Sequence, residues 1–301
     1  MNITVIGCGY LGAVHACAMA ELGHRVVGVD IDRDKIEALA EGRAPFHEPG
    51  FTEILRRRIK AGGLTFTTDF SAIRGAQAHF VAVGTPQGPG GAADLTHVEA
   101  AVEAMKPYLG RCLDGAEIVV GKSTVTVGTA ARLAPAIADT GAVLAWNPEF
   151  LREGFAVEDT LNPDRMVYGL PDDPADAERA TAVLDELYAP IIESGTPRLV
   201  MDYATAELAD EGARVVVTDP AAAQILAADD DLPYDVAADL EEALTAADLV
   251  LLATEWDHYT HCDPAWAADL VDRRNVVDGR HALDPEAWRN AGFAYAAVGS
   301  R

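Results

Sequence analysis

Residues 1–30 carry the pattern that most constrains the fold of this chain. Residues 3–6 form a short apolar run typical of a strand, and they lead directly into a G-x-G-x-x-G turn at residues 7–12. Residues 13–22 are rich in alanine and leucine and predict a helix, and residues 25–29 predict a second strand that ends at Asp30. This order of strand, glycine turn, helix, strand and acid is the context in which such a turn binds a dinucleotide.

Each glycine of the turn has a distinct physical role. Gly7 permits the tight turn, Gly9 lets the backbone approach a pyrophosphate, and Gly12 lets the helix pack closely on the strand. Tyr10 and Leu11 begin the helix, whose free N–H groups and positive dipole end favour a phosphate. The alternative is a glycine-rich turn of an α/β domain that holds no ligand.

Asp30 indicates which dinucleotide would bind. Its carboxylate can accept hydrogen bonds from the ribose hydroxyls, and its charge would repel a 2′-phosphate, so we expect NAD rather than NADP. Lys35 follows closely and would lie near the ribose, although a solvated helix lysine is an equally good interpretation.

Composition bounds the classes of function. A length of 301 residues suggests about two domains, and the net charge of −25 without a basic block argues against nucleic acid or an anionic membrane as a partner. We see no signal peptide and no apolar stretch of membrane-spanning length.

The four cysteines lack C-x-x-C spacing, which suggests a reducing cytoplasm and no structural zinc. His258, His261 and Cys262 are spaced too loosely for a metal site, and a solvated loop is the better interpretation.

Strand-like runs alternate with helical segments over residues 1–200. This alternation predicts a parallel sheet covered on both faces, hence an α/β, Rossmann-like domain. Ligands of such sheets bind beyond the carboxyl ends of the strands. We therefore expect the glycine turn, Asp30, Thr85, Thr124 and residues 147–153 to converge on one cleft.

These positions carry an ordered set of motifs. The chain resembles the UDP-glucose/GDP-mannose dehydrogenase family, most closely its UDP-glucose 6-dehydrogenases, in the glycine turn, V-D-I-D at 29–32, E-P-G at 48–50, V-G-T-P at 83–86, K-S-T-V at 122–125, N-P-E-F-L-R-E-G at 147–154, P-D-R at 163–165, T-E-W at 254–256 and V-D-G-R at 277–280. The resemblance implies a cytoplasmic, NAD-dependent oxidoreductase that acts on a nucleotide sugar, UDP-glucose above all. It also implies a place in UDP-glucuronate and polysaccharide biosynthesis.

The resemblance also implies residue roles. Thr124 would position the catalytic water or the nicotinamide, and Thr85 would contact the cofactor. Glu149 and Glu153 would lie by the nicotinamide and the sugar, one of them as general base. The spacing favours one helix face for both glutamates, with Asn147 as the N-cap. Without the resemblance, Glu149 would more simply stabilise a helix N-terminus.

Further residues would contact the nucleotide sugar. The resemblance assigns this role to Glu149, Phe150, Leu151, Arg152 and Arg280. Arg280 follows a predicted strand and could pair with a phosphate; the alternative is an ordinary surface arginine.

A large departure from the family lies in the middle of the chain. Family members continue from a segment that matches residues 205–208 into a long helical domain, which supplies a Lys and an Asn, and later into a loop with a nucleophilic Cys and an Asp. Here residue 208 is followed almost at once by E-G-A-R-V at 211–215. We therefore expect a shortened linker at 201–212 and a smaller, truncated α/β nucleotide-binding domain at 213–301. Its sheet would lack a central strand and leave unpaired edges.

This departure from the family limits the oxidation that we expect the chain to catalyse. Family members oxidise the sugar C6 alcohol to a carboxylate in two hydride transfers, and a Cys thiolate traps the intermediate aldehyde as a thiohemiacetal. None of the four cysteines here is placed for that role. Three hypotheses stay open: a nucleotide-sugar dehydrogenase with impaired complete oxidation, a non-catalytic NAD-binding or regulatory protein, and a two-electron alcohol dehydrogenase on a nucleotide or nucleoside. A homo-oligomer is possible, although family dimers use the central domain.

Overall fold

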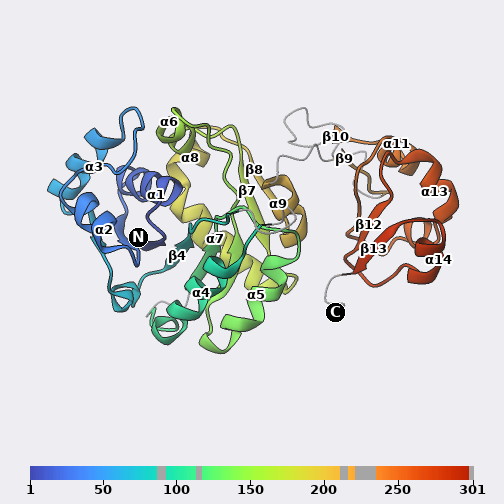
Figure 1. Cartoon of the computed structure of the whole chain (residues 1–301), viewed down its shortest axis with the longest axis horizontal. Coiled ribbons are helices and arrows are strands. Elements are labelled where there is room, and N and C mark those ends of the chain that lie inside the picture. The colour runs from blue at the N-terminus through green and yellow to red at the C-terminus, as the bar shows by residue number, and fades with distance from the viewer. Residues whose placement is uncertain (87–92, 113–116, 211–215, 221–234, 298–301) are drawn as a thin grey trace. The chain divides into compact units, whose positions relative to one another are not determined.

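The computed structural model describes residues 1–86, 93–112, 117–210, 216–220 and 235–297. The chain divides into two compact units, residues 1–212 and residues 213–301, and each is described by itself. Figure 1 labels their helices and strands. None of the described helices is long and apolar enough to cross a membrane.

The N-terminal unit is built on one eight-stranded sheet of order β3-β2-β1-β4-β5-β6-β7-β8. Its neighbouring strands are parallel except for the antiparallel contact between β6 and β7. The strands are β1 (Asn2–Ile6), β2 (Arg25–Val29), β3 (Leu64–Thr67), β4 (Ala78–Val81), β5 (Ile118–Gly121), β6 (Val143–Trp146), β7 (Met166–Leu170) and β8 (Arg198–Asp202).

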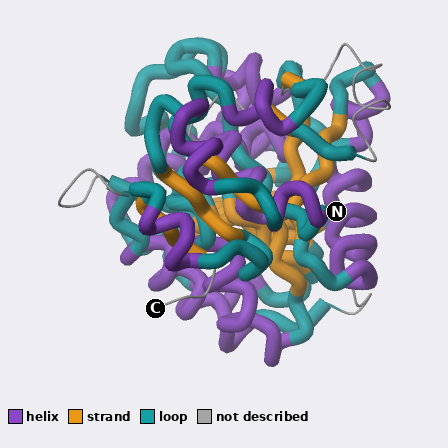
Figure 2. Tube along the Cα trace, turned by 90° about the vertical axis from the view of Figure 1, so that its right-hand side faces the viewer, coloured by secondary structure: helices purple, strands orange, loops and turns teal. Residues whose placement is uncertain are grey.

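Helices flank this sheet, as Figures 1 and 2 show. The α-helices are α1 (Tyr10–Glu21), α2 (Arg33–Ala40), α3 (Phe51–Lys60), α4 (Thr96–Met105), α5 (Thr129–Ile137), α6 (Ala156–Leu161), α7 (Pro174–Leu187), α8 (Ala189–Glu193) and α9 (Tyr203–Asp210). Single 3₁₀ turns lie at η1 (Phe70–Ile73), η3 (Lys106–Tyr108) and η4 (Ala138–Thr140). Two buried apolar clusters follow from this layering, one packed around α1, α3 and α7 and the other around α4 and α5.

The strands alternate with helices because continuous apolar runs such as that of β1 are buried on both faces of a parallel sheet. The predicted α/β class with a Rossmann-like N-terminal domain is confirmed. Residues 201–212, for which the sequence predicts a shortened linker, include the end of β8 and the whole of α9. Their role as a linker, and the boundaries at residues 200 and 213, stay predictions.

The C-terminal unit is smaller and its described strands form two sheets, β10-β9 and β11-β12-β13. Its strands are β9 (Val216–Val217), β10 (Asp235–Val236), β11 (Val250–Leu252), β12 (Asn275–Asp278) and β13 (Ala294–Ala297). Its helices are α11 (Leu240–Leu244), α12 (Asp257–Thr260), α13 (Pro264–Leu270) and α14 (Pro285–Asn290), and an apolar cluster that includes Trp288 and Phe293 forms its core.

One predicted helix is wrong. The sequence predicts a helix that opens at Asn147, but residues 147–155 form a loop and α6 begins only at Ala156. The left-handed backbone of Gly154, with φ of 84°, interrupts any helix there.

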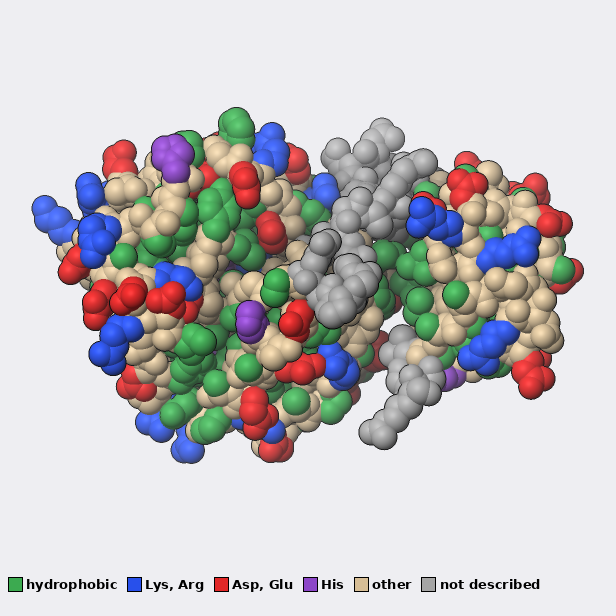
Figure 3. Space-filling model, in the orientation of Figure 1, with side chains coloured by type: hydrophobic (Ala, Val, Ile, Leu, Met, Phe, Trp, Pro, Cys, Tyr) green, Lys and Arg blue, Asp and Glu red, His purple; other side chains and the backbone are tan. Residues whose placement is uncertain are grey.

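Charged side chains are mixed over the surface. On the face seen in Figure 3, acidic and basic side chains are interspersed. The excess of acid in the sequence therefore does not gather into one patch on that face.

Candidate active site

The glycine turn between β1 and α1 is shaped by contacts at two of its three glycines. Gly7 has φ of 91°, and a Cβ there would lie 2.8 Å from the carbonyl oxygen of Ala82. A Cβ on Gly12 would lie 1.8 Å from the carbonyl oxygen of Gly7. A Cβ on Gly9, in contrast, would meet no described atom within 4 Å. Packing therefore demands the first and third glycines, whereas the second keeps open the space that a pyrophosphate needs beside the first turn of α1.

Asp30 ties the end of β2 to this turn. Its Oδ2 accepts hydrogen bonds from the backbone N–H of Cys8 at 2.7 Å and from Lys35 Nζ at 2.8 Å. Its Oδ1 accepts one from the N–H of Asp32 at 2.9 Å. Burial would raise the pKa of Asp30, but the donors Lys35, Asp32 and Cys8 outweigh it and the pKa is lowered. A charged carboxylate with acceptor capacity left on Oδ1 fits the ribose of NAD.

The turn is also connected to the loop at residues 147–155. The hydroxyl of Tyr10, the first residue of α1, donates a 2.5 Å hydrogen bond to Glu48 Oε2. The backbone N–H of Gly154 donates to the same oxygen at 3.0 Å. Burial and the bond to Glu48 raise the pKa of Tyr10 to about 12, so its hydroxyl keeps its proton and stays a donor at neutral pH. Glu48 therefore fixes the last part of this loop beside the cofactor turn.

The first part of the loop is fixed by buried polar groups. Asn147 donates from Nδ2 to the carbonyl oxygen of Val167 at 2.9 Å, and its Oδ1 accepts from the Tyr188 hydroxyl at 2.7 Å. Lys122 Nζ lies 3.3 Å from the same Oδ1 and 3.5 Å from the carbonyl oxygen of Pro148. Asn147, Lys122 and Tyr188 are all buried, so this end of the loop has little freedom.

The two loop glutamates do not share a helix face, because no helix forms between them. Glu149 instead folds back so that its Oε2 accepts from the backbone N–H of Leu151 at 2.8 Å. The expectation that Glu149 and Glu153 share one helix face, and that Asn147 is the N-cap of that helix, is therefore wrong. What places both glutamates at this edge of the sheet is the anchoring of the loop at its two ends.

A cavity of about 470 Å³ is lined in part by this loop. His15 and Lys122 line it together with four predicted substrate residues, which are Glu149, Phe150, Leu151 and Arg152. His15 is fully buried, and neither ring nitrogen has a hydrogen-bond partner among the described residues. Burial and the Lys122 charge hold the pKa of His15 well below its usual value, so the ring is neutral and offers one donor and one acceptor.

Two arginines that line this cavity already have partners in the N-terminal unit. Arg152 pairs with Asp159 at 2.6 Å, and the guanidinium of Arg165 lies 4.2 Å from the centre of the Phe150 ring. Arg152 would have to exchange this acidic partner to bind a ligand phosphate.

The loops after β4 and β5 meet at the same edge. Thr85 Oγ1 donates to the carbonyl oxygen of Thr124 at 2.7 Å, and Ser123 Oγ donates to the carbonyl oxygen of Val83 at 2.6 Å. Thr85 and Thr124 therefore lie together beyond the carboxyl ends of adjacent strands, as the sequence predicts.

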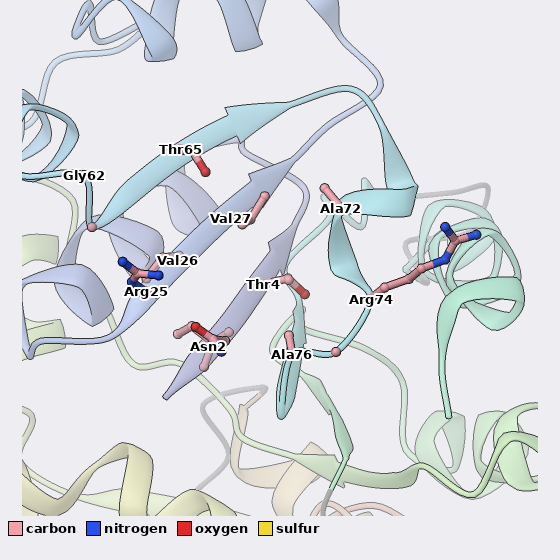
Figure 4. Close-up of a pocket in the computed structure, with 13 residues that line it drawn as sticks. Asn2, Thr4, Arg25, Val26, Val27, Gly62, Thr65, Ala72, Arg74 and Ala76 are labelled. Atoms are coloured by element: carbon pink, nitrogen blue, oxygen red, sulfur yellow. The ribbon is translucent and has the colours of Figure 1, made fainter. Parts of the chain in front are cut away.

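A second hollow lies elsewhere on this unit. Figure 4 shows it among Asn2, Thr4, Arg25 and Arg74, where β1 and β2 begin. None of the predicted site residues lines it, so we do not assign it to the cofactor.

Arg280 belongs to the C-terminal unit. Its guanidinium pairs with Glu255 at 3.1 Å, and its backbone N–H donates to Asp278 Oδ1 at 3.0 Å. Hydrogen bonds from Leu283, Tyr295 and Arg280 outweigh burial and lower the pKa of Asp278. A phosphate at Arg280 would therefore have to compete with Glu255.

Three of the four cysteines, Cys8, Cys17 and Cys262, are poorly suited to act as nucleophiles. Burial raises the pKa of Cys8 and Cys17, and it raises that of Cys262 to about 11. Among the described residues, no group of three or more His, Cys, Asp and Glu side chains could hold a metal ion.

Sequence reasoning missed the residues that hold the loop: Glu48, Lys122 and Tyr188. Glu48 and Lys122 stand in two of the motifs that carry the family resemblance. Their place in those motifs was the sequence signal that could have indicated a role at the site. Tyr188 has no such signal, because its contact with Asn147 spans 41 positions.

Comparison with known proteins identifies both parts of the chain. Residues 1–192 match the NAD binding domain of the UDP-glucose/GDP-mannose dehydrogenase family, and residues 202–285 match its UDP binding domain. The UDP-glucose 6-dehydrogenase TuaD of Bacillus subtilis is 40% identical over 63% of this chain and 40% of its own length. The UDP-glucose 6-dehydrogenase of Rhizobium meliloti is 41% identical over 69% of this chain and 47% of its own length. The chain thus spans less than half of these relatives.

Solved structures of related dehydrogenases also align with this chain. A ternary complex of GDP-mannose dehydrogenase from Pseudomonas aeruginosa aligns with a TM-score of 0.62 and 30% identity, over 70% of this chain and 49% of that one. A UDP-glucose dehydrogenase from Pyrobaculum islandicum aligns with a TM-score of 0.62 and 26% identity, over 100% of this chain and 98% of that one. The N-terminal unit is an NAD-binding domain, and the chain belongs to the UDP-glucose/GDP-mannose dehydrogenase family.

Proposed function

We propose that this chain is a nucleotide-sugar dehydrogenase of the UDP-glucose 6-dehydrogenase type, in which NAD-dependent oxidation of the sugar C6 alcohol is impaired. The relatives named as UDP-glucose 6-dehydrogenases support the substrate class. The single observation that carries the proposal is the Tyr10–Glu48–Gly154 contact, which joins the cofactor turn to the loop with Glu149 and Glu153.

The residues of the N-terminal unit support distinct roles. The glycine turn and Asp30 would hold the pyrophosphate and the ribose of NAD, and bound NAD would accept the hydride from the sugar. Thr85 and Thr124, brought together at 2.7 Å, would face the nicotinamide end. Glu149 or Glu153 would take the proton released from the substrate, since a carboxylate is a competent general base when it is correctly placed.

The cysteines support the impairment. Oxidation to the carboxylate in this family uses a thiolate, and the pKa values of Cys8, Cys17 and Cys262 are all raised. If none of the four cysteines supplies a thiolate at the site, a chain with a competent NAD site would stop at the aldehyde or not react. This is why a two-electron alcohol dehydrogenase and a non-catalytic NAD-binding protein stay as rivals.

The deciding experiment is the stoichiometry of NADH formed per UDP-glucose consumed, with NAD affinity measured on the same purified protein. We expect NAD binding with fewer than two NADH per sugar. Two NADH per sugar, with UDP-glucuronate as the product, would overturn the impairment, and Cys262 would then be substituted next. One NADH with a trapped aldehyde would favour the two-electron enzyme. NAD binding without turnover of any sugar nucleotide would favour the non-catalytic protein.

A further inference from the structure

The described strands of the C-terminal unit match a doubly wound order from which one member is missing. In the N-terminal unit the first six strands run β3-β2-β1-β4-β5-β6, with β1 at the centre. The described strands of the C-terminal unit run β10-β9 and, separately, β11-β12-β13. On the N-terminal pattern, β10 and β9 take the places of β3 and β2, and β11 to β13 take those of β4 to β6. Among the described residues, no strand takes the place of β1.

Backbone hydrogen bonds show to which side the residues of β9 and β11, the two inner strands, direct their N–H and C=O groups. The carbonyl oxygen of Val217 accepts from the N–H of Ala237, and that of Leu252 accepts from the N–H of Gly279, each at 2.9 Å. Both bonds run outward, toward β10 and β12. Because successive residues of a strand direct their N–H and C=O groups to opposite sides, Val216 and Leu251 direct theirs inward.

Side-chain contacts hold the two inner strands in one unit. The Tyr259 hydroxyl lies 3.3 Å from Thr218 Oγ1, and Trp256 Nε1 lies 3.2 Å from Asp219 Oδ2. Thr218 and Asp219 directly follow β9, whereas Trp256 and Tyr259 belong to the segment that follows β11. The carboxyl ends of β9 and β11 therefore lie on the same side of the unit.

The inner strands are apolar but incompletely covered. Val216, Val217, Val250 and Leu251 are only half-buried and Leu252 is buried, whereas residues 3–6 of β1 are all buried. Central strands of a parallel sheet are normally buried on both faces, and their apolar runs reflect it. Apart from Leu252, the inner strands thus combine the apolar sequence of central strands with the partial exposure of edge strands.

We propose that the C-terminal unit takes up one β-strand from a second, different polypeptide, inserted parallel to β9 and β11 and apolar on both faces. A single extended strand offers N–H and C=O groups to both edges at once. The strands on either side of it, β9 and β11, are apolar at successive positions, so its own side chains should be Val, Ile or Leu at successive positions. A second copy of this chain is a poor donor, because each of its described strands is already paired with at least one neighbouring strand and could not offer both edges.

The test uses the full chain and a synthetic peptide with five successive Val and Ile residues flanked by lysines. Hydrogen exchange of the Val216 and Leu251 amides reports insertion, and we expect the peptide to slow it by about tenfold or more. The matched control is the same peptide with proline at its central position, which cannot donate to the ladder and should give no protection. Equal protection by both peptides, or none by either, would overturn the proposal.

A variant separates strand insertion from other peptide binding. Leu251→Pro removes an N–H that points inward, away from β12, so the unit should keep its far-ultraviolet circular dichroism and lose peptide protection at Val216. Leu251→Val keeps the N–H and should retain that protection. Peptide protection at Val216 that persists in a folded Leu251→Pro variant would contradict the proposal. Full protection of both amides in the free chain would also contradict it, since the position would then be filled already.

Discussion

Tyr10 and Glu48 connect the cofactor turn to the substrate loop through one carboxylate oxygen. Glu48 Oε2 accepts from the Tyr10 hydroxyl at 2.5 Å and from the Gly154 N–H at 3.0 Å. Glu48 is only 5% exposed, so water cannot easily replace it as the acceptor. The position of the loop therefore depends on a residue that is far from it in sequence.

Replacement of Glu48 should destabilise the N-terminal unit. Glu48→Ala leaves the half-buried Tyr10 hydroxyl and the Gly154 backbone N–H without their buried acceptor, and the loss of these two hydrogen bonds costs about 1–3 kcal/mol in the free energy of unfolding. Urea denaturation of the wild type and the variant measures this loss in the free energy of unfolding. The control is Glu53→Ala, since the Glu53 side chain is 83% exposed and pairs only weakly with Arg57. Equal losses in the two variants would show that the buried contact has no special weight.

The second and third glycines of the turn should respond differently to alanine. Gly12→Ala places a Cβ 1.8 Å from the Gly7 carbonyl, so the turn must deform and the unit should lose stability. Gly9→Ala meets no described atom within 4 Å, so the protein should keep its melting temperature but lose NAD affinity. Thermal melts and calorimetric titration with NAD measure both effects. Unchanged NAD affinity in Gly9→Ala would place the pyrophosphate elsewhere.

Asp30 should determine the preference for NAD over NADP. Asp30→Asn weakens the hydrogen bonds to the ribose hydroxyls, and a loss of about 1.4 kcal/mol corresponds to a tenfold weaker NAD affinity. It also removes the charge that repels a 2′-phosphate, so the ratio of NADP to NAD affinity should rise. Asp34→Asn is the control because it removes one negative charge from an exposed position in α2 and keeps the Asp30 carboxylate. An unchanged affinity ratio in Asp30→Asn would remove Asp30 from the ribose site.

A buried polar network should make stability depend on acid pH. Glu117 accepts from His79 Nε2 at 2.9 Å and from the backbone N–H of Arg111 at 3.0 Å, and His79 Nδ1 lies 2.7 Å from Thr4 Oγ1. Burial opposes the charge of Glu117, but the hydrogen bonds from His79, Cys112 and Arg111 prevail and its pKa is lowered.

The sign of the pH effect follows from this lowered pKa. The stabilisation is complete above the unfolded carboxyl pKa of about 4.3 and is lost as the pH falls through the folded value. Glu117→Gln should therefore lower the free energy of unfolding at pH 7 by about 1–3 kcal/mol and flatten its fall below pH 4.3. Urea titrations across pH measure this, with the 76% exposed Glu103 changed to Gln as the control. A parallel pH profile in wild type and Glu117→Gln would contradict the assignment.

Local patterns in the sequence determined most of the N-terminal unit. The glycine turn, Asp30 and the apolar strands could be predicted because each depends on spacing within a few residues. The same holds for the convergence of Thr85 and Thr124, since strands of a parallel sheet place their carboxyl ends on one edge. For the C-terminal unit the motif order predicts a sheet that lacks a central strand, and its described strands form two separate sheets.

Only the tertiary structure decided how the substrate loop is held. The sequence predicts a helix from Asn147, because Asn, Pro and Glu in that order are a good helix start. Contacts with Glu48 and Tyr188, which are far away in the chain, outweigh that local preference and hold residues 147–155 as a loop. Periodicity and spacing describe neighbours along the chain, whereas a buried hydrogen bond joins residues that only the fold brings together.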